Sequence, residues 1–201
     1  MSYEKELKLL LNKEDYSSFL NSYQEITNPL NQINYYFDTN EFSLNQLGVT
    51  LRIREENERN LLLCLKTKLN DLLSDITISN ELEKNISRTD FNEYQKNPEE
   101  IITYLNNELP VSIKNKLEHN QLQLLGSIKN QRRKLLFNEY ICDLDYTIYP
   151  NGEVFYELEF EGMESEIDSE KIMQYLDINE IKYTVNKKSK YKRFVECIVN
   201  N

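Results

Sequence analysis

Apolar and charged residues alternate along much of the chain, with the period of two that is typical of β-strands. The first segment shows the pattern clearly, because Leu7 and Leu9 share one face while Glu4, Glu6 and Lys8 share the other. The same alternation recurs in eight later segments. It predicts strands at residues 2–11, 32–39, 49–55, 60–68, 75–83, 127–137, 140–148, 153–161 and 189–199.

Three stretches have the longer apolar spacing of amphipathic helices instead. Residues 13–25 place Tyr16, Phe19 and Leu20 on one face, and residues 168–182 form a second candidate helix. Residues of about 88–125 form a helical insert between two strand-rich parts. Without a glycine- or proline-rich linker, we expect one domain over residues 1–201, of the α+β class, with helices packed outside a mostly antiparallel sheet.

Composition narrows the possible functions. A hydrophobic content of 39% and a charged content of 29% are typical of a globular protein, and no apolar run could span a bilayer or act as a secretory signal. The net charge of −10 disfavours nucleic acid as a partner. The three cysteines lack metal-binding spacing, and their odd number suggests a cytoplasmic location. The single histidine, His119, is expected at the surface. Having one histidine argues against a histidine-based metal site or a catalytic triad.

The charged faces of the strands carry the candidate chemistry. Each face alone is also what a solvated strand shows, with surface ion pairs that contribute little to stability. The charged faces recur on many strands. If these strands close into one sheet and helices cover the apolar faces, the charged faces would line a lumen. Acidic pairs suit Mg²⁺ or Mn²⁺, and basic pairs suit phosphate. The basic pairs are Arg52/Arg54 and Lys66/Lys68, and the acidic pairs are Glu4/Glu6, Glu81/Glu83, Asp143/Asp145 and Glu157/Glu159.

The order of these residues resembles a known family over essentially the whole chain. A Glu-x-Glu-x-Lys start at Glu4, Glu6 and Lys8 is typical of the CYTH superfamily, the triphosphate tunnel metalloenzymes, here closest to the short single-domain bacterial branch. The later matching segments are 35–39, 51–55, Leu65-Lys66, Glu81, Arg132, Leu144-Asp145, 156–159 and Ser189-Lys190. The resemblance implies an eight-stranded antiparallel β-barrel, a tunnel with a charged lumen and flanking helices.

The resemblance also implies roles for individual residues. The catalytic set would be Glu4, Glu6 and Lys8. The substrate phosphates would be held by Lys8, Arg52, Arg54, Lys66, Arg132 and Lys190. One or two Mg²⁺ or Mn²⁺ ions would be held by Glu4, Glu6, Glu81, Asp145, Glu157 and Glu159. The roles of Lys68, Glu83, Asp143 and Arg133, which neighbour matched positions, stay open.

The implied activity is metal-dependent hydrolysis of a triphosphate. Inorganic triphosphate is the favoured substrate, with thiamine triphosphate, nucleoside triphosphates and polyphosphate as further candidates. Two alternatives remain open: a module that binds a phosphorylated metabolite or nucleotide without turnover, and an adenylate cyclase of the same fold. We expect a small-molecule partner, no nucleic acid or membrane partner, and a monomer or homodimer.

Overall fold

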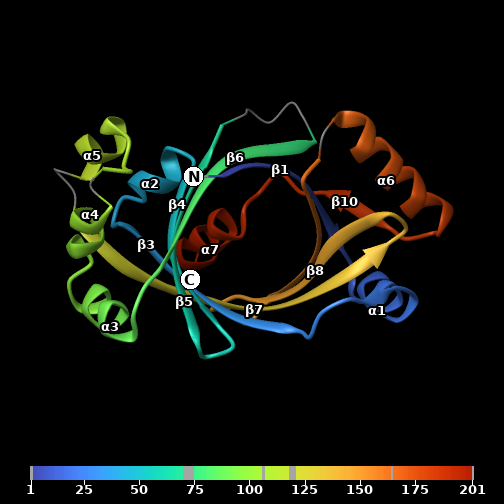
Figure 1. Ribbon diagram of the computed structural model, residues 1–201, viewed down its shortest axis with the longest axis horizontal. Helices are drawn as coiled ribbons and strands as arrows, with labels where there is room; N and C mark the ends of the chain where they lie inside the picture. Colours follow the sequence, from blue (N-terminus) through green and yellow to red (C-terminus); the bar gives the residue numbers. More distant parts are fainter. Residues whose placement is uncertain (1, 70–74, 106, 118–120, 164, 201) are drawn as a thin grey trace.

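A closed barrel of eight antiparallel strands forms the centre of the molecule (Figure 1). The structure is a computed structural model that describes residues 2–69, 75–105, 107–117, 121–163 and 165–200. Around the barrel the strands follow the order β1-β6-β5-β4-β3-β7-β8-β9, and β9 pairs with β1 to close the ring. They are β1 (Ser2–Leu11), β3 (Leu30–Thr39), β4 (Val49–Glu56), β5 (Asn60–Lys68), β6 (Ile76–Asn85), β7 (Leu122–Phe137), β8 (Tyr140–Ile148) and β9 (Val154–Glu161). The expected eight-stranded barrel is therefore confirmed.

Of the helices in the described residues, six lie outside the barrel and one lies inside it. Figure 1 shows α1 and α6 at one side and α2 to α5 at the other, with α7 in the lumen. The helices are α1 (Lys13–Ser22), α2 (Ser43–Gln46), α3 (Arg88–Lys96), α4 (Glu99–Tyr104), α5 (Val111–Leu117), α6 (Glu166–Ile178) and α7 (Lys190–Val199). Two short strands lie outside the closed ring. Strand β2 (Gln24–Glu25) pairs with β7, and β10 (Tyr183–Val185) pairs with β1. None of the helices in the described residues is long and apolar enough to cross a membrane.

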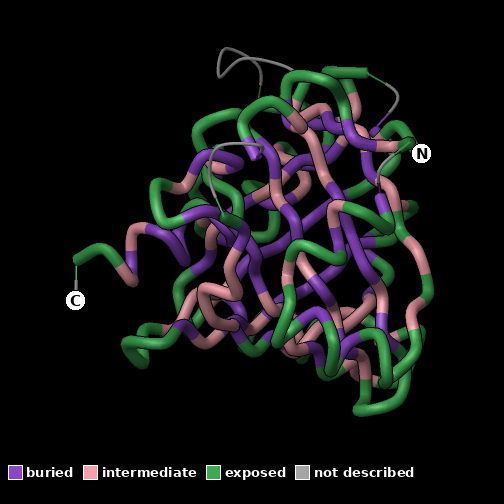
Figure 2. The backbone as a smooth tube through the Cα atoms, turned by 90° about the vertical axis from the view of Figure 1, so that its left-hand side faces the viewer, coloured by how far each residue is buried: buried purple, intermediate pink, exposed green. Residues whose placement is uncertain are grey.

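The outward faces of the strands form two apolar cores. On the side of α1 and α6, Leu7 and Leu158 pack with Phe19, whereas on the other side Leu51 packs with Ile101. Figure 2 shows the buried segments running through the interior and the exposed ones at the ends and loops. Because side chains alternate across a strand, burying the apolar residues outward turns the charged residues toward the lumen.

The segment expected as a final strand at residues 189–199 is a helix, so that prediction was wrong. Tyr191, Phe194 and Val195 recur at helical spacing and form a third apolar cluster with Tyr36 of β3 and Ile128 of β7. Ser189 caps the helix by accepting a hydrogen bond from the backbone N–H of residue 192. The lumen therefore contains a helix, and the apolar face of that helix fills one part of it.

The helical insert ends earlier than expected. Its helices stop at Leu117, and β7 begins at Leu122 rather than at residue 127. The register of β7 against β3 shifts at Leu125, which lies opposite the step from Tyr36 to Phe37. This bulge reverses the alternation, so Leu124 before it and Leu135 after it both face outward although their numbers differ in parity. Helix α6 likewise covers 166–178 rather than 168–182, and His119 lies outside the described residues.

Candidate functional site

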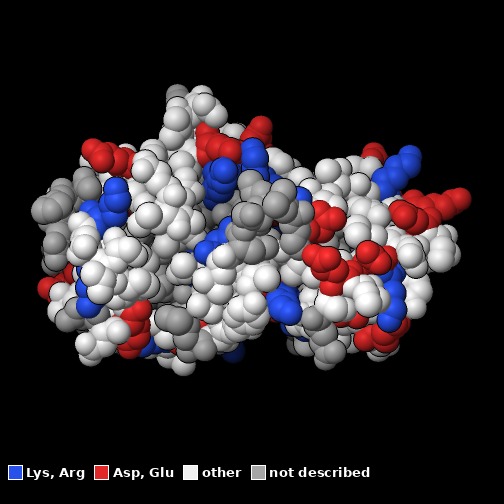
Figure 3. All heavy atoms as spheres, turned by 90° about the horizontal axis from the view of Figure 1, so that it is seen from above, with Lys and Arg blue, Asp and Glu red and all other residues white. Residues whose placement is uncertain are grey.

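A cavity of about 580 Å³ runs through the lumen beside the N-terminal end of α7. Its walls are the inward residues of the barrel strands, which is why the alternation in the sequence identified them. Among the described residues that line it are ten of the twelve expected site residues, namely Glu4, Glu6, Lys8, Arg52, Arg54, Lys66, Glu81, Arg132, Glu159 and Lys190. On the face seen from above, acidic and basic side chains also lie close together near the middle of the molecule (Figure 3).

Lys66 of β5 is the centre of one charged group in this cavity. Its ammonium lies 2.9 Å from Glu4, 3.1 Å from Glu6 and 3.6 Å from Glu81. Glu81 is the cross-strand neighbour of Lys66, and it also pairs with Arg52 at 3.2 Å. Burial alone would lower the pKa of Lys66, but the three carboxylates outweigh it and hold that pKa above its ordinary value. Lys66 is therefore charged and already surrounded by acceptors that a phosphate could replace.

Arg132 and Lys190 form a second charged group. Arg132 of β7 lies 2.7 Å from Asp145 and 2.5 Å from Glu159. Lys190, the first residue of α7, lies 3.0 Å from Asp145 and 2.7 Å from both Glu157 and Glu159. Burial alone would raise the pKa of Glu159, but Lys190, Lys8 and Arg132 hold it well below its usual range. The two cations thus share Asp145 and Glu159 at the inner wall, and Lys190 also pairs with Glu157.

Asp145 and Glu157 lie deeper than the other expected metal ligands. Both are fully buried, and neither is among the described residues that line the cavity. Asn130 donates to Asp145 at 3.0 Å, and Arg193 of α7 pairs with Glu157 at 3.3 Å. The structure brings these two carboxylates behind Lys190, where they act as partners for buried cations.

Of the four residues left open, three line the cavity and one does not. Lys68, Glu83 and Asp143 face the lumen, whereas Arg133 points outward and pairs with Glu25 at 2.9 Å. Arg133 is therefore outside the site.

Sequence reasoning missed several lumen residues. Glu161 continues the alternation of Glu157 and Glu159 by one more step, so the signal for it was present in the sequence. Tyr36 and Ser79 also line the cavity with buried hydroxyls, for which no hydrogen-bond partner is found within the described part of the chain. Nothing in the alternation distinguishes such hydroxyls from ordinary strand residues.

Glu6, Glu159 and Glu161 are the residues best placed to hold a metal ion. Each offers a carboxylate oxygen, and the three oxygens lie within 4.8 Å of one another. An all-carboxylate set with one ligand, Glu161, about half exposed suits a hard cation such as Mg²⁺ or Mn²⁺ that keeps bound water. A second group joins Cys64 with Glu81 and Glu83, but burial raises the pKa of the Cys64 thiol to about 12 and disfavours the thiolate that a metal requires.

Comparison with known proteins agrees with this arrangement. The model of the CYTH domain family matches residues 2–195. The chain belongs to the CYTH domain family. This CYTH chain is similar to HpAC1 from Hippeastrum, described as a candidate adenylyl cyclase with a dominant triphosphatase activity. The identity is 25%, with 96% of this chain and 95% of that chain covered and a TM-score of 0.77.

Other solved structures extend the comparison. A candidate adenylate cyclase from Bacillus halodurans is 25% identical, with 96% and 99% of the two chains covered and a TM-score of 0.71. A hypothetical protein from Pyrococcus furiosus shares the fold at 19% identity, with 89% and 91% covered and a TM-score of 0.58. No curated protein matches the chain. The resemblance drawn from the sequence is thus confirmed at the level of family and fold.

Proposed function

We propose that this CYTH protein is a metal-dependent triphosphatase whose favoured substrate is inorganic triphosphate, acting within a single domain that carries α3 to α5 as an insert. The observation that carries the proposal is the convergence of cations from β1, β4, β5, β7 and α7 on one elongated cavity. A linear triphosphate is a small polyanion, and such a row of cations matches its charge. The triphosphatase activity described for HpAC1 supports the same direction.

In the proposed reaction, the lumen cations bind and orient the phosphates. Arg52, Arg54 and Lys66 are paired with carboxylates, and a triphosphate would take over some of those contacts. Arg132 would bind the other end of the triphosphate, also by exchanging a carboxylate contact for a phosphate contact. Since phosphoryl transfer needs little covalent help from a protein, positioning and charge neutralisation would supply most of the rate enhancement.

The carboxylates have a complementary role in the proposal. Glu6, Glu159 and Glu161 would hold the cation, which when bound supplies charge neutralisation and a more acidic water. Glu4, which is partly buried and shares the ion-pair partner Lys66 with Glu6, would orient the attacking water. Asp145 and Glu157 would keep Arg132 and Lys190 in place, a different role from the metal binding that the resemblance implied.

One panel of assays tests the proposal against its alternatives. The purified protein would be incubated with inorganic triphosphate, thiamine triphosphate, ATP or long polyphosphate, each with Mg²⁺ or Mn²⁺, and phosphate and cyclic AMP would be measured. We expect phosphate release, fastest from inorganic triphosphate, and a requirement for the metal. Cyclic AMP from ATP would instead support the cyclase, as the descriptions of two similar structures suggest. Tight triphosphate binding without phosphate release would support the binding module.

A further inference from the structure

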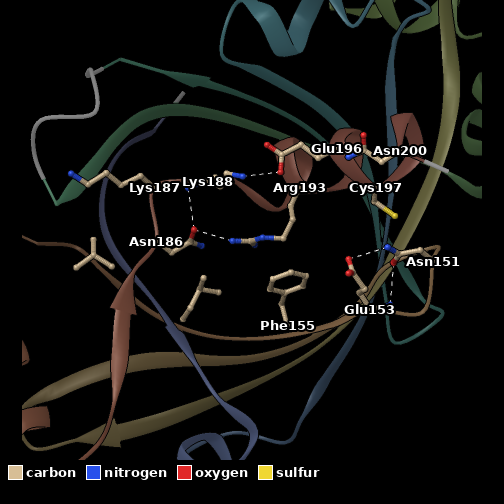
Figure 4. Close-up of a pocket in the computed structure, with 12 residues that line it drawn as sticks. Asn151, Glu153, Phe155, Asn186, Lys187, Lys188, Arg193, Glu196, Cys197 and Asn200 are labelled. Carbon is tan, nitrogen blue, oxygen red and sulfur yellow. Dashed lines mark hydrogen bonds and ion pairs between the residues drawn. The ribbon is translucent and has the colours of Figure 1, made fainter.

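A second cavity, of about 690 Å³, lies along the C-terminal half of α7 (Figure 4). It is an open pocket bordered by α7, by the end of β10 and the segment after it, and by the turn before β9 and the start of that strand, and it has the volume of a typical small-molecule site. Only Lys187 and Lys188 line both this far pocket and the lumen cavity; the other described lining residues belong to one or the other. The far pocket is therefore distinct from the proposed active site.

The described lining of the far pocket combines a buried arginine and two lysines with two carboxylates and several apolar side chains. Arg193 is only 7% exposed, and its guanidinium carbon lies 4.4 Å from the centre of the Phe155 ring. Figure 4 shows the Arg193 side chain above Phe155, reaching toward Asn186, whose Oδ1 accepts a hydrogen bond from it at 2.9 Å. Leu10 and Val185 add apolar surface. A guanidinium has five N–H donors and such walls suit a ring or alkyl group, so the matching ligand is an oxyanion on a partly apolar body.

Glu157 connects the far pocket to the lumen. One of its oxygens pairs with Arg193 at 3.3 Å and accepts from Asn186 at 2.5 Å, both of which line the far pocket. The other oxygen lies 2.7 Å from the ammonium of Lys190, which lines the lumen cavity. A single buried carboxylate is thus shared between a cation on each side.

We propose that the far pocket is a regulatory site for an organic monophosphate, coupled to the lumen through Arg193, Glu157 and Lys190. An anion that draws Arg193 toward the far pocket leaves Glu157 with Lys190 as its remaining cation. Lys190 is then held more tightly by Glu157 and is less available to a phosphate in the lumen. The coupling is therefore negative, and by linkage triphosphate weakens binding in the far pocket by the same factor. The effect on triphosphate binding rests on the proposed function, whereas the binding of a monophosphate in the far pocket does not.

Calorimetry with AMP, adenosine and orthophosphate tests the site without any turnover. The titrations use the whole protein with EDTA, and we expect AMP to bind more tightly than orthophosphate and adenosine not to bind. Asn200→Trp, just after the end of α7, places a large ring at the far pocket and should weaken AMP binding at least tenfold, and Asn151→Trp does the same from the turn before β9. AMP binding that survives both substitutions would place AMP in the lumen and overturn the proposal, as would the absence of AMP binding at millimolar concentration.

The coupling has its own measurement. Coupling between sites typically changes affinity by about 5- to 150-fold, so AMP should raise the Kd for inorganic triphosphate by a factor in that range, to a plateau. Arg193→Gln should also raise the Kd for inorganic triphosphate, because it removes the guanidinium that pairs with Glu157. Arg193→Lys should recover part of the triphosphate affinity, because lysine keeps the positive charge although it lacks the guanidinium. Val199→Ala, at an exposed position of the same helix that is in the described lining of neither cavity, is the matched control and should change neither the affinity for AMP nor the Kd for triphosphate. A Kd for triphosphate that is the same with and without saturating AMP would contradict the coupling while leaving the binding result intact.

Discussion

Arg54 and Arg88 are both ion-paired arginines, and they differ in which side of the barrel wall they occupy. Arg54 lines the lumen cavity and pairs with Glu83 at 3.4 Å, whereas Arg88 begins α3 outside the barrel and pairs with Glu55. We expect Arg54→Ala to reduce triphosphate turnover by about 10²–10³, because one positioned charge is lost from the transition state. Arg88→Ala should leave turnover unchanged. Equal rates for Arg54→Ala and the wild type in saturating metal would remove Arg54 from the proposed site.

Glu6 and Asp145 were both expected to bind metal, but their surroundings differ. Glu6 belongs to the carboxylate group at the cavity, while Asp145 is fully buried against Arg132 and Lys190. Glu6→Gln should therefore raise the Mn²⁺ concentration needed for half-maximal activity by roughly tenfold or more. Asp145→Asn should instead lower the free energy of unfolding, by about 1–3 kcal/mol, since a buried partner of two cations is weakened.

Metal titrations and thermal unfolding of both variants measure these two effects. Glu6→Asp is a useful companion, because it keeps the charge and should recover part of the metal affinity. If Asp145→Asn needs as much extra metal as Glu6→Gln and unfolds like the wild type, Asp145 binds metal after all.

The sequence predicts which residues face the lumen far better than how deep they lie. Alternation alone separates Glu6 from Leu7, because a period of two decides the face of a strand. It does not separate Glu159, at the cavity, from Glu157, two residues earlier and behind Lys190. Depth along the tunnel depends on which strands pair and on the helix that enters the lumen, and both are long-range properties of the fold.

At the scale of elements, α7 is the clearest difference between expectation and structure. The run from Lys187 to Arg193 has alternating lysines that mimic a strand, yet the apolar residues Tyr191, Phe194 and Ile198 recur at three and four positions, as in a helix. Arg193 could only be placed beside Lys190 once that helix was known. The strands are easier to predict from the sequence, because most have several leucines or isoleucines at alternating positions. That spacing places them on one face of a strand, whereas a helix would spread them around its axis.

Gly126 on β7 lets α7 approach the barrel wall closely. Its φ is +141°, and a Cβ there would lie 3.2 Å from the ring of Phe194. We expect Gly126→Ala to destabilise the protein by about 1–3 kcal/mol, since the added methyl overpacks the contact. For a chain of this size that corresponds to a Tm lower by roughly 2–12 °C.

Gly152→Ala is the matched control for this prediction. Gly152 also has a positive φ, of +84°, but open space where its Cβ would lie. It isolates the cost of backbone strain, which both substitutions carry. A Tm for Gly126→Ala as high as that of Gly152→Ala would mean that α7 shifts freely in the lumen.

At the scale of the whole molecule, the barrel encloses charges that a simple domain would keep in water. The lumen cations Lys66, Arg132 and Lys190 are each paired with two or more carboxylates, so these cations are balanced by acids of the same lumen. Buried ion pairs of this kind are weak contributors to stability, because desolvation offsets their attraction. When triphosphate and metal bind together, the phosphates pair with the lumen cations and the metal pairs with the lumen carboxylates. Both charged sets then have a stronger partner, so ligand binding should stabilise the fold.

Inorganic triphosphate with Mn²⁺ should therefore raise the Tm of the protein more than either component alone. A ligand at one hundred times its Kd adds about 2.7 kcal/mol to the free energy of unfolding, which for a chain of this size is roughly 5–10 °C. Thermal unfolding with triphosphate, Mn²⁺ or both measures the increase, with orthophosphate at the same concentration as the control. In Arg54→Ala the increase should shrink, whereas in Arg88→Ala it should persist, because only Arg54 of the two lines the cavity. Should triphosphate and metal together leave the Tm where metal alone leaves it, the lumen does not bind triphosphate and the proposed function fails at its first step.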